Sequence, residues 1–450
     1  MSTSSSNTIA VLGGGISGLS TAWYLKKKGF EVTLFEAQES TGGVIRSEPN
    51  QYSVFDFGPN TIRDKTGSVS EMITDLGLED EMLSMSEGSK TRFIVKNGEL
   101  KKIKQNPISF LFSDVLSWKG KKELFSEPIR KSLNSDADES IGSFLERRIG
   151  KEAVEYLADP FFSGIYAGDI YSLSKKKLIG KLADFEQEYG SITKGFLKSR
   201  KKKSSFKPKV ISFKKGVQKL TETLSEGLDD SILHEEVKNL QVQQSNFKVT
   251  TADHEYTFDK VVSCLPAYVL KEVLKTDDQK LENSLSEIDY SPMLSTQLVF
   301  KKEDLNLPEN GFGFLVPRKE NIRLLGAIWK SNIFPDQTKD EYVHVNLMTG
   351  GSHDRKVMDQ DISDIEKEVI EEFSAIMDVK GDAEMVASKL WKKAIPQFHV
   401  GFASVEESID RFQKENEDFY IGGNFRWGVS VSDCVDGAKN LIQFIENRYL

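Results

Sequence analysis

The sequence has few of the residues that build disulfide frameworks and metal centres. Its 450 residues include only two cysteines, Cys264 and Cys434, and five histidines. Two cysteines are too few for a disulfide framework, so we expect each to be a small buried side chain in a protein from a reducing compartment. The histidines show no ligand spacing, and the sequence therefore predicts no metal site.

Long apolar runs and a net positive charge are also missing. No stretch approaches the roughly 18 consecutive apolar residues of a membrane-spanning helix, and the opening residues lack the basic and apolar regions of a signal peptide. The net charge of −9 disfavours nucleic acid as a partner. With 38% hydrophobic and 29% charged residues, the composition is typical of a globular protein of two or three domains, which we expect in the cytoplasm.

The first informative feature is a glycine-rich turn near the start of the chain. Residues 8–35 follow a strand–turn–helix–strand pattern, and the turn carries Gly13, Gly15 and Gly18 in the spacing GxGxxG. The first glycine allows a tight turn, the second lets the backbone approach a pyrophosphate, and the third lets the helix pack against the strand. Glu36 follows at the distance at which a carboxylate accepts hydrogen bonds from a ribose. The pattern predicts a dinucleotide site, and an ordinary glycine turn is the alternative.

The next two motifs select the dinucleotide. Residues 40–47, STGGVIRS, carry Gly43 and Arg46 and resemble the second flavin fingerprint of the FAD-dependent amine oxidase superfamily. The glycines let the backbone run along phosphates, and an arginine offers them a planar fork. Residues 55–62, FDFGPNTI, resemble the segment that passes the flavin in that superfamily. Together these motifs favour FAD over NAD, and they contain no histidine or cysteine for a covalent link, so we expect non-covalent FAD.

Motifs along essentially the whole chain resemble the protoporphyrinogen oxidase family. They are PFFSGIYAGDIYSLS (160–174), SFKKGVQKL (212–220), GFGFLVP (311–317), LLGAIWKSNIFPD (324–336), LWKKAIPQFHVGF (390–402) and GGNFRWGVSVSDCVDGA (422–438). The resemblance implies an α/β fold with α+β parts. A discontinuous Rossmann-type FAD-binding domain carries a mixed-sheet substrate domain and a helical insertion domain.

The resemblance also implies domain boundaries. The FAD-binding domain is predicted to comprise residues 1–90, 214–268 and 394–450. The substrate-binding domain would comprise 91–100 and 269–393, and the helical, membrane-associating domain 101–213. Residues 194–209 in this last segment carry eight basic residues and no acid. They are either a solvated loop or a patch for anionic lipid.

Site residues carry over from the family motif by motif. The residues implied for the flavin site are Gly13, Gly15, Gly18, Glu36, Gly43, Arg46, Gly58, Asn60, Val237, Trp391, Gly423 and Val431. The residues implied for the substrate site are Arg92, Leu315, Ile328, Met348 and Gly168. In this second set Arg92 would pair with a propionate of the tetrapyrrole, Leu315 and Ile328 would hold one pyrrole ring, and Met348 would stack on another.

The activity that the resemblance implies is oxidation of protoporphyrinogen IX to protoporphyrin IX in three successive two-electron steps. Oxygen would be the acceptor and hydrogen peroxide the product, within haem biosynthesis. No catalytic side chain is implied, because the flavin carries the hydride and pyrrole nitrogens lose their own protons. The implied partners are the porphyrinogen, oxygen, a ferrochelatase that receives the product, and the inner face of the cell membrane. The protein could be a monomer or a homodimer.

Three other functions stay open at this point. Oxidation of coproporphyrinogen III to coproporphyrin III on the same fold would need more cations in the pocket, because that substrate has four carboxylates. A flavin-holding module without turnover would be yellow but inactive. A general amine oxidase is the third alternative, although the more specific motifs lie outside the flavin fingerprints.

Overall fold

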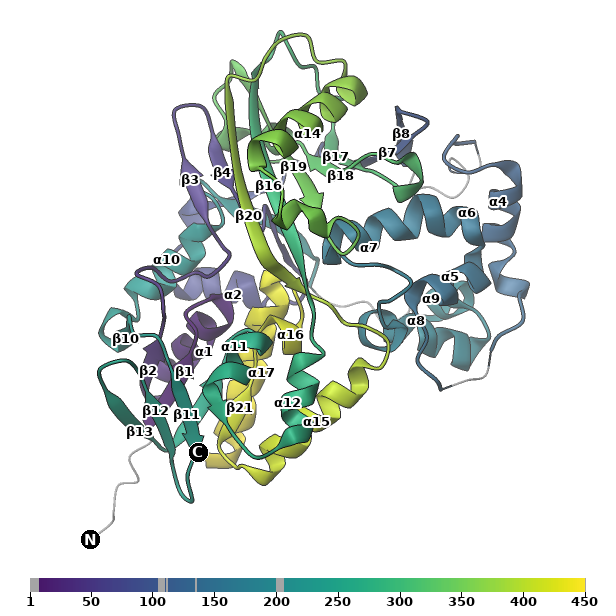
Figure 1. Ribbon diagram of the computed structural model, residues 1–450. Helices are drawn as coiled ribbons and strands as arrows, with labels where there is room; N and C mark the ends of the chain where they lie inside the picture. The colour runs from purple at the N-terminus through teal and green to yellow at the C-terminus, as the bar shows by residue number, and fades with distance from the viewer. Residues whose placement is uncertain (1–7, 104–109, 111, 134–135, 200–205, 450) are drawn as a thin grey trace.

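The computed structural model describes residues 8–103, 110, 112–133, 136–199 and 206–449. Residues 1–7, for which the sequence predicts no signal peptide, and residues 200–205 of the basic run lie outside the described residues. Figure 1 shows a nucleotide-binding region that contains the N-terminal strand and the last helix, a large sheet beside it, and a group of helices on the far side of that sheet.

A five-stranded parallel sheet forms the nucleotide-binding region, with the strand order β10-β2-β1-β14-β21. The strands are β1 (Thr8–Leu12), β2 (Glu31–Phe35), β10 (Ile232–Leu233), β14 (Lys260–Ser263) and β21 (Phe419–Ile421). The central strands are buried on both faces, which explains why their sequences are apolar runs without alternation. The sheet draws its strands from three distant parts of the chain, as the discontinuous domain requires.

Helices from both ends of the described chain cover one face of this sheet. They are α1 (Ile16–Lys27), α2 (Ser68–Asp75), α10 (Gln218–Glu226) and α17 (Val431–Tyr449). α1 packs directly against α17, and Leu19 and Leu25 of α1 share a core with Val435 and Ile442 of α17. The sequence predicts this first helix over residues 16–28, with Gly29 ending it, and α1 ends one residue earlier, at Lys27.

The opposite face is covered by three helices and a four-stranded sheet of order β13-β12-β11-β15. The helices are α11 (Ala267–Val273), α12 (Gln279–Ser286) and α15 (Phe402–Glu415). The strands are β11 (Asn239–Val242), β12 (Phe247–Thr250), β13 (Glu255–Phe258) and β15 (Leu274–Lys275). Apolar side chains from all of these elements form the second core.

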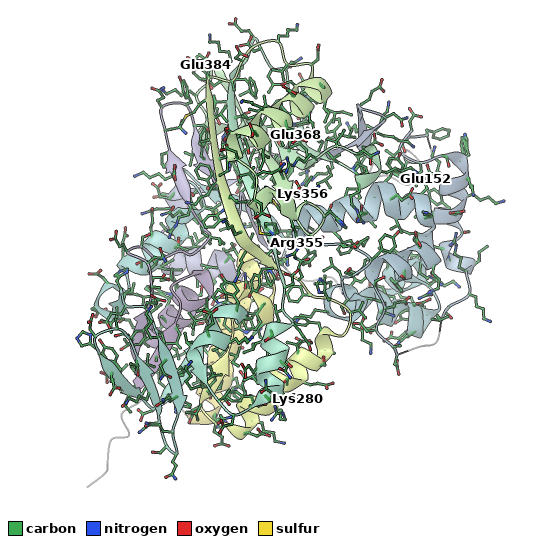
Figure 2. The ribbon with its side chains drawn as sticks, in the orientation of Figure 1. Glu152, Lys280, Arg355, Lys356, Glu368 and Glu384 are labelled. Atoms are coloured by element: carbon green, nitrogen blue, oxygen red, sulfur yellow. The ribbon has the colours of Figure 1, made fainter. Side chains whose placement is uncertain are left out.

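A seven-stranded mixed sheet of order β20-β16-β19-β18-β17-β7-β8 forms the second region. Its strands are β7 (Thr91–Lys96), β8 (Glu99–Ile103), β16 (Tyr290–Lys301), β17 (Gly311–Leu315), β18 (Leu324–Ile328), β19 (Tyr342–Gly350) and β20 (Met385–Pro396). One face packs against α14 (Ile362–Met377) through Ile365, Val369 and Phe373. Charged residues such as Glu368 of α14 point outward (Figure 2), so α14 is amphipathic.

The remaining elements of these two regions are small. They are β3 (Ser47–Pro49) with β4 (Val54–Asp56), the sheet of β5 (Ile62–Asp64), β9 (Lys209–Phe213) and β6 (Met82–Ser84), and the short helices α13 (Lys330–Ile333) and α16 (Asn424–Trp427). Single 3-10 turns occupy Glu79–Glu81, Glu127–Ile129, Asp229–Ser231, Arg318–Glu320, Pro335–Gln337 and Arg355–Met358.

The third region is helical and contains α4 (Trp118–Phe125), α5 (Ile141–Ile149), α6 (Lys151–Ala153), α7 (Asp159–Tyr166), α8 (Lys175–Tyr189) and α9 (Ile192–Ser199). A single π turn, Val154–Ala158, joins α6 to α7. Within the described ranges, no helix combines the length and the apolar character that crossing a bilayer requires.

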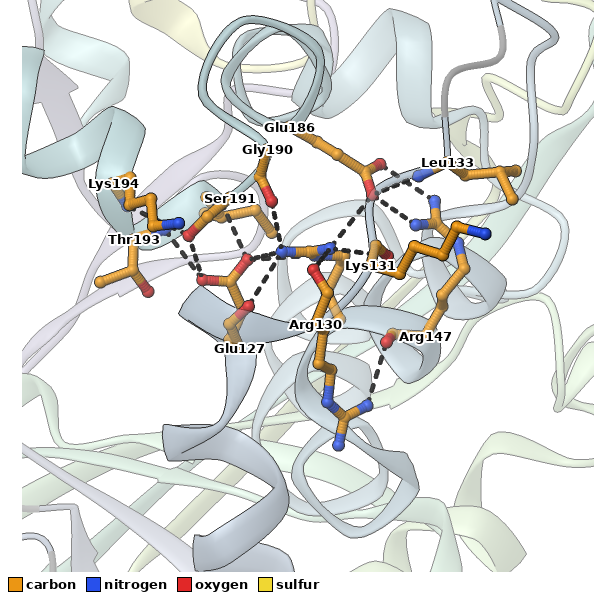
Figure 3. Close-up of polar contacts among 12 residues, drawn as sticks. Glu127, Arg130, Lys131, Leu133, Arg147, Glu186, Gly190, Ser191, Thr193 and Lys194 are labelled. Carbon is orange, nitrogen blue, oxygen red and sulfur yellow. Dashed lines mark hydrogen bonds and ion pairs between the residues drawn. The ribbon is translucent and has the colours of Figure 1, made fainter.

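A buried charge cluster holds the helical region together (Figure 3). The fully buried Arg148 forms an ion pair with Glu127, whose carboxylate also accepts hydrogen bonds from Ser191 Oγ at 2.7 Å and Ile192 N at 2.9 Å. Burial alone would raise the pKa of Glu127. The hydrogen bonds from Arg148, Ser191 and Thr193 outweigh it and hold this pKa at about 2.

The predicted domain boundaries stay a prediction, and three elements bear on them. β8 carries the large sheet to Ile103, whereas the prediction ended that segment at residue 100. β9, inside the predicted helical segment 101–213, pairs with β5 and β6. α11 and α12 pack on the nucleotide-binding sheet, although α12 and most of α11 fall within the predicted substrate segment 269–393.

Candidate active site

The first glycine turn leaves an open path along the start of α1. Gly13 has a φ of +97° and donates its N–H to Phe35 O at 2.8 Å, which ties the turn to β2. A Cβ on Gly18 would lie 1.8 Å from Gly13 O, so only glycine lets α1 pack this closely. A Cβ on Gly15 would meet no described atom within 4 Å. The N-terminus of α1 therefore faces free space, as an anion site requires.

Glu36 lies at the end of β2, beside the glycine turn. Its Oε2 accepts a hydrogen bond from Gly14 N at 2.8 Å, and its Oε1 accepts one from Gln38 N at 2.9 Å. A carboxylate has about four acceptor positions, so the half-buried Glu36 can still accept hydrogen bonds from a ribose.

The second glycine turn lies directly against the first. Gly42 N donates to Gly14 O at 2.8 Å, and a Cβ on Gly43 would lie 3.4 Å from Gly15 Cα. Arg46 closes this turn, because its Nη1 donates to Thr41 O at 2.6 Å. Two fingerprints that the sequence separates by about 25 residues thus form one cradle.

The segment Asp56–Asn60 extends this cradle, and we call it the flavin wall. Phe57 N donates to Arg46 O at 2.9 Å, and a Cβ on Gly58 would lie 2.0 Å from Val44 O. Trp391 on β20 reaches across from the large sheet, and its Nε1 donates to Phe57 O at 2.8 Å. The structure therefore brings Gly58, Asn60 and Trp391 together with Arg46, as expected for one cofactor site.

Three further residues of the predicted flavin set lie around the ends of the parallel strands. Val237 is buried in the second core beside Phe35. Val431 starts α17 in the first core. Gly423, with φ +92°, follows β21, and its Cβ would lie 3.4 Å from Cys264 O.

One face of the large sheet carries the predicted substrate residues. Along each strand, alternate residues pack against α14, which assigns the residues between them to the other face. The residues on that other face are Arg92, Leu315, Ile328, Asn346, Met348, Ser295, Gln297, Lys389 and Trp391. The face therefore runs from Arg92 on β7, next to the edge strand β8, to Trp391 on the opposite edge strand β20.

Arg92 is a half-buried cation without an acidic partner in the described part of the chain. Its guanidinium carbon lies 3.7 Å from the centre of the Phe312 ring, and its Nη1 donates to Ser89 O at 3.1 Å. Burial, with a smaller contribution from the positive charge of Arg63, lowers the pKa of Arg92 to about 10. Arg92 thus remains charged near neutral pH and is available to an external carboxylate.

A helix covers the apolar part of this face. A Cβ on Gly164 of α7 would lie 2.8 Å from Leu315 Cδ2. Phe161 and Ile165 share that side of α7 and are 49% and 42% exposed, which is unusual for large apolar residues. Gly168, just beyond α7, packs against Gln397 and Leu173. It marks the end of the covering helix and does not itself line the sheet face.

The family model of flavin containing amine oxidoreductases matches residues 16–440. The chain belongs to this family. It is an FAD-dependent oxidoreductase, and the two glycine turns, Glu36 and the open N-terminus of α1 fit the pyrophosphate and ribose of FAD.

Two known enzymes are similar in sequence to this flavin containing amine oxidoreductase along almost its whole length. It is 32% identical to protoporphyrinogen oxidase 2, chloroplastic/mitochondrial, of Arabidopsis thaliana, over 98% of this chain and 95% of that one. It is 26% identical to coproporphyrinogen III oxidase of Bacillus subtilis, over 96% of both chains. The predicted resemblance to the protoporphyrinogen oxidase family is confirmed.

Solved structures confirm the predicted fold class. A structure from Exiguobacterium sp. 255-15, assigned as a protoporphyrinogen oxidase, superposes with a TM-score of 0.85 at 20% identity over 99% of both chains. Reduced UDP-galactopyranose mutase superposes with a TM-score of 0.76 at 14% identity, over 98% of this chain and 94% of the other.

The sequence did not reveal the polar network behind the flavin wall of this amine oxidoreductase. Lys330 and Asp56 form a fully buried ion pair, and His344, Gln297 and Asn346 are buried next to it. Burial, and then the charge of Lys330, lower the pKa of His344 well below its usual value. The only sequence signal was polar residues alternating with apolar ones along β16 and β19.

The cysteines are inert in this structure. Burial is the main reason that the pKa of each thiol, Cys264 and Cys434, is raised to about 12. Among the described residues, no group of three His, Cys, Asp or Glu side chains could hold a metal ion.

Proposed function

We propose that the protein oxidises a porphyrinogen, with protoporphyrinogen IX as its first substrate. The observation that carries the proposal is Arg92, a half-buried cation without an acidic partner among the described residues, on the same sheet face as the apolar side chains Leu315, Ile328 and Met348. An apolar macrocycle with carboxylates at its rim matches this arrangement of one cation beside an apolar wall.

The register of the sheet shows how far Arg92 lies from the flavin wall. Arg92 pairs with Gly313, Gly313 with Ile328, and Ile328 with Asn346, so these residues form one row across four strands. Neighbouring strands lie about 4.8 Å apart, which places the backbones of Arg92 and Asn346 about 14 Å apart. Asn346 contacts Asn60 of the flavin wall. A carboxylate held by Arg92 would therefore lie far from the reacting carbon, as in a tetrapyrrole.

The protein's own residues bind, orient and shield the substrate in this proposal. Arg92 holds a propionate, and Phe312 fixes the plane of its guanidinium group. Leu315, Ile328 and Met348 form the apolar wall, and α7 packs against Leu315. When bound, FAD supplies the redox chemistry and accepts two electrons in each oxidation.

No general base is assigned. His344 is the nearest histidine to the row of site residues, but it is fully buried and both of its ring nitrogens have partners, Ser53 Oγ at 2.7 Å and Gln297 Oε1 at 2.8 Å. The pyrrole N–H groups of the substrate can release their own protons. The sheet face therefore has a binding role and not a proton-transfer role.

One observation favours coproporphyrinogen III as a second candidate. Lys389 lies on the same sheet face, two residues from Trp391, with its Nζ 5.0 Å from the centre of the Trp391 ring. In the described part of the chain it has no carboxylate within ion-pairing distance. A second cation suits a substrate with four carboxylates.

The cellular setting is part of the same proposal. Exposed apolar residues gather in the helical region, namely Phe112, Trp118, Ile129, Leu133, Phe196 and Leu197, each more than half exposed. Exposed lysines such as Lys119, Lys122 and Lys131 lie among them. This combination supports peripheral binding to an anionic membrane on its cytoplasmic face. Oxygen as the acceptor, a ferrochelatase that takes the product, and a monomer or homodimer remain proposals.

Parallel assays with both porphyrinogens test the function. Porphyrin fluorescence, oxygen uptake and peroxide are followed with and without oxygen, and we expect faster turnover of protoporphyrinogen. Faster turnover of coproporphyrinogen would make that the substrate, and a yellow protein inactive with both would refute the proposal. Acid precipitation should release free FAD into the supernatant, because the linkage is expected to be non-covalent.

A further inference from the structure

The ion pair of Lys330 and Asp56 is completely removed from solvent. Lys330 is the first residue of α13 and Asp56 the last of β4, and Lys330 Nζ lies 2.6 Å from Asp56 Oδ2. The other carboxylate oxygen of Asp56 accepts hydrogen bonds from Val217 N at 3.0 Å and Ser47 Oγ at 2.5 Å. Burying two charges is costly, and well-packed apolar residues would often serve stability as well. The pair therefore suggests a role in placing a particular segment.

The segment that the pair holds is Asp56–Asn60, the flavin wall. Lys330 Nζ donates a second hydrogen bond, to Asn60 O, at 3.2 Å. At the start of the segment, Gln297 Nε2 donates to Asp56 O at 2.8 Å, and Trp391 holds Phe57 O from the same sheet. Three backbone carbonyls are thus fixed by side chains of the large sheet and α13, and not by a neighbouring strand.

A directional hydrogen-bond chain fixes the side chain of Asn60 as well. His344 is neutral, and its Nε2–H donates to Gln297 Oε1 at 2.8 Å. Gln297 Nε2 donates to Ser295 Oγ at 2.9 Å, and Ser295 Oγ donates to Asn346 Oδ1 at 3.0 Å. Asn346 Nδ2 then donates to Asn60 Oδ1 at 2.9 Å. The carboxamide of Asn60 can therefore have only one orientation.

This orientation leaves a hydrogen-bond donor at the flavin wall. With its Oδ1 occupied, Asn60 has two N–H groups, and one of them reaches Gly58 O at 3.3 Å. Gly58 itself lies against the second glycine turn at Val44. The amide of Asn60 is thus held next to the turn that would carry the cofactor.

We infer that Lys330 is a positioning residue of the flavin site: with Asp56 it fixes the Asp56–Asn60 segment, so that Asn60 offers an amide N–H to bound FAD. The inference concerns cofactor binding and does not depend on which substrate is oxidised. It can therefore fail or hold independently of the porphyrinogen assays.

The test compares full-length wild type with Lys330→Met. FAD is removed and titrated back to the apoprotein, and the flavin midpoint potential is measured on the reloaded protein. Loss of a charge-assisted hydrogen bond to the segment should weaken FAD binding by about 10- to 100-fold. The midpoint potential should shift, because a donor near the flavin changes its electronics.

Arg148→Met is the matched control. Arg148 is also a fully buried cation, but its partner Glu127 lies in the helical region. This variant should unfold at a lower temperature and keep the wild-type FAD affinity and midpoint potential. If Lys330→Met behaves in the same way, with loss of stability alone, the inference is overturned.

If Lys330→Met does not fold, a second variant, Asn346→Leu, tests whether the Asn60 amide is positioned for FAD. Asn346→Leu removes the donor to Asn60 Oδ1 without leaving any charge unpaired. It should also weaken FAD binding and shift the midpoint potential. Unchanged values for both quantities would refute the positioning role.

Discussion

The guanidinium group of Arg92 stacks on the ring of Phe312, with 3.7 Å between the guanidinium carbon and the ring centre. The two residues come from neighbouring strands, β7 and β17. The stacking fixes the plane of the guanidinium group and leaves its edge for a carboxylate. Arg92 is therefore prepared to bind an anionic group before any substrate arrives.

Arg92→Ala should raise KM by about 10- to 100-fold and leave kcat close to wild type. The lost interaction is a charge-assisted hydrogen bond worth about 1.5–3 kcal/mol, and it is made equally in the ground state and the transition state. Steady-state kinetics with protoporphyrinogen measure both constants. Arg92→Lys, which keeps the charge but loses the planar fork, should lie in between. Flavin content should not change, and a fall in kcat alone would place Arg92 in the chemistry.

Gly15→Ala should separate cofactor binding from folding. A Cβ at this position meets no described protein atom within 4 Å, so the apoprotein should unfold at the wild-type temperature. FAD affinity should nevertheless fall, because the methyl group occupies the path of the pyrophosphate. Apoprotein melting and FAD titration measure the two effects. Gly18→Ala is the contrasting variant, since its Cβ would lie 1.8 Å from Gly13 O, and it should destabilise the apoprotein too. A Gly15→Ala protein that binds FAD normally would contradict the assignment.

His344 should make the protein less stable as the pH falls. Burial keeps its imidazole neutral in the folded state, whereas the unfolded chain binds a proton near the ordinary pKa of 6.5. The free energy of unfolding should therefore decrease below about pH 6.5, by at most about 1.4 kcal/mol per pH unit. Denaturant titrations at pH 7.5 and 5.5 measure the slope.

His344→Gln should reduce this slope, although the variant is less stable at both pH values. His234→Gln is the control, because His234 is exposed and contacts only Gln38 O through its ring. Equal slopes in wild type and His344→Gln would show that another group causes the pH dependence. Glu127, whose pKa is held at about 2, contributes in a separate window below about pH 4.5.

Trp118→Glu combined with Ile129→Glu should abolish binding to anionic vesicles. These side chains are 71% and 86% exposed, next to exposed lysines, and two modest signals are needed for stable attachment. Sedimentation with anionic and neutral vesicles, at low and high salt, measures the binding. Phe444→Glu on α17 is the control, because Phe444 is 54% exposed but lies outside the helical region. Wild type that sediments with neither vesicle type at low salt would refute membrane binding.

Local sequence patterns predicted the first βαβ unit to within one residue. Strand, glycine turn and helix are determined by neighbours along the chain, so periodicity and the positions of Gly13 and Gly29 were sufficient. Residues 418–450 repeat the strand–glycine–helix pattern, which indicates that they belong to the same domain; in the structure β21 joins the sheet beside β14, and α17 packs on α1.

Contacts between distant strands could not be predicted in the same way. Lys330 and Asp56 are 274 residues apart, and although each lies in a motif, 324–336 or 55–62, no local pattern indicates that they pair. Their pairing depends on the register of β16 and β19 and on the place of α13 after β18. A contact between near neighbours was also missed. The fingerprint indicated that Arg46 contacts phosphate, whereas the structure shows that its Nη1 also donates a hydrogen bond to Thr41 O in the same turn.

The packing of α17 on α1 has a consequence for how the protein is made. β1 and α1 emerge from the ribosome first, but the sheet lacks β21 and its covering helix until residues 419–449 have been synthesised. At about 5–20 residues per second, this delay is on the order of 20–80 s. Throughout that interval the apolar side of α1 has no partner from α17, so the first core of the protein can close only after residues 431–449 have been made.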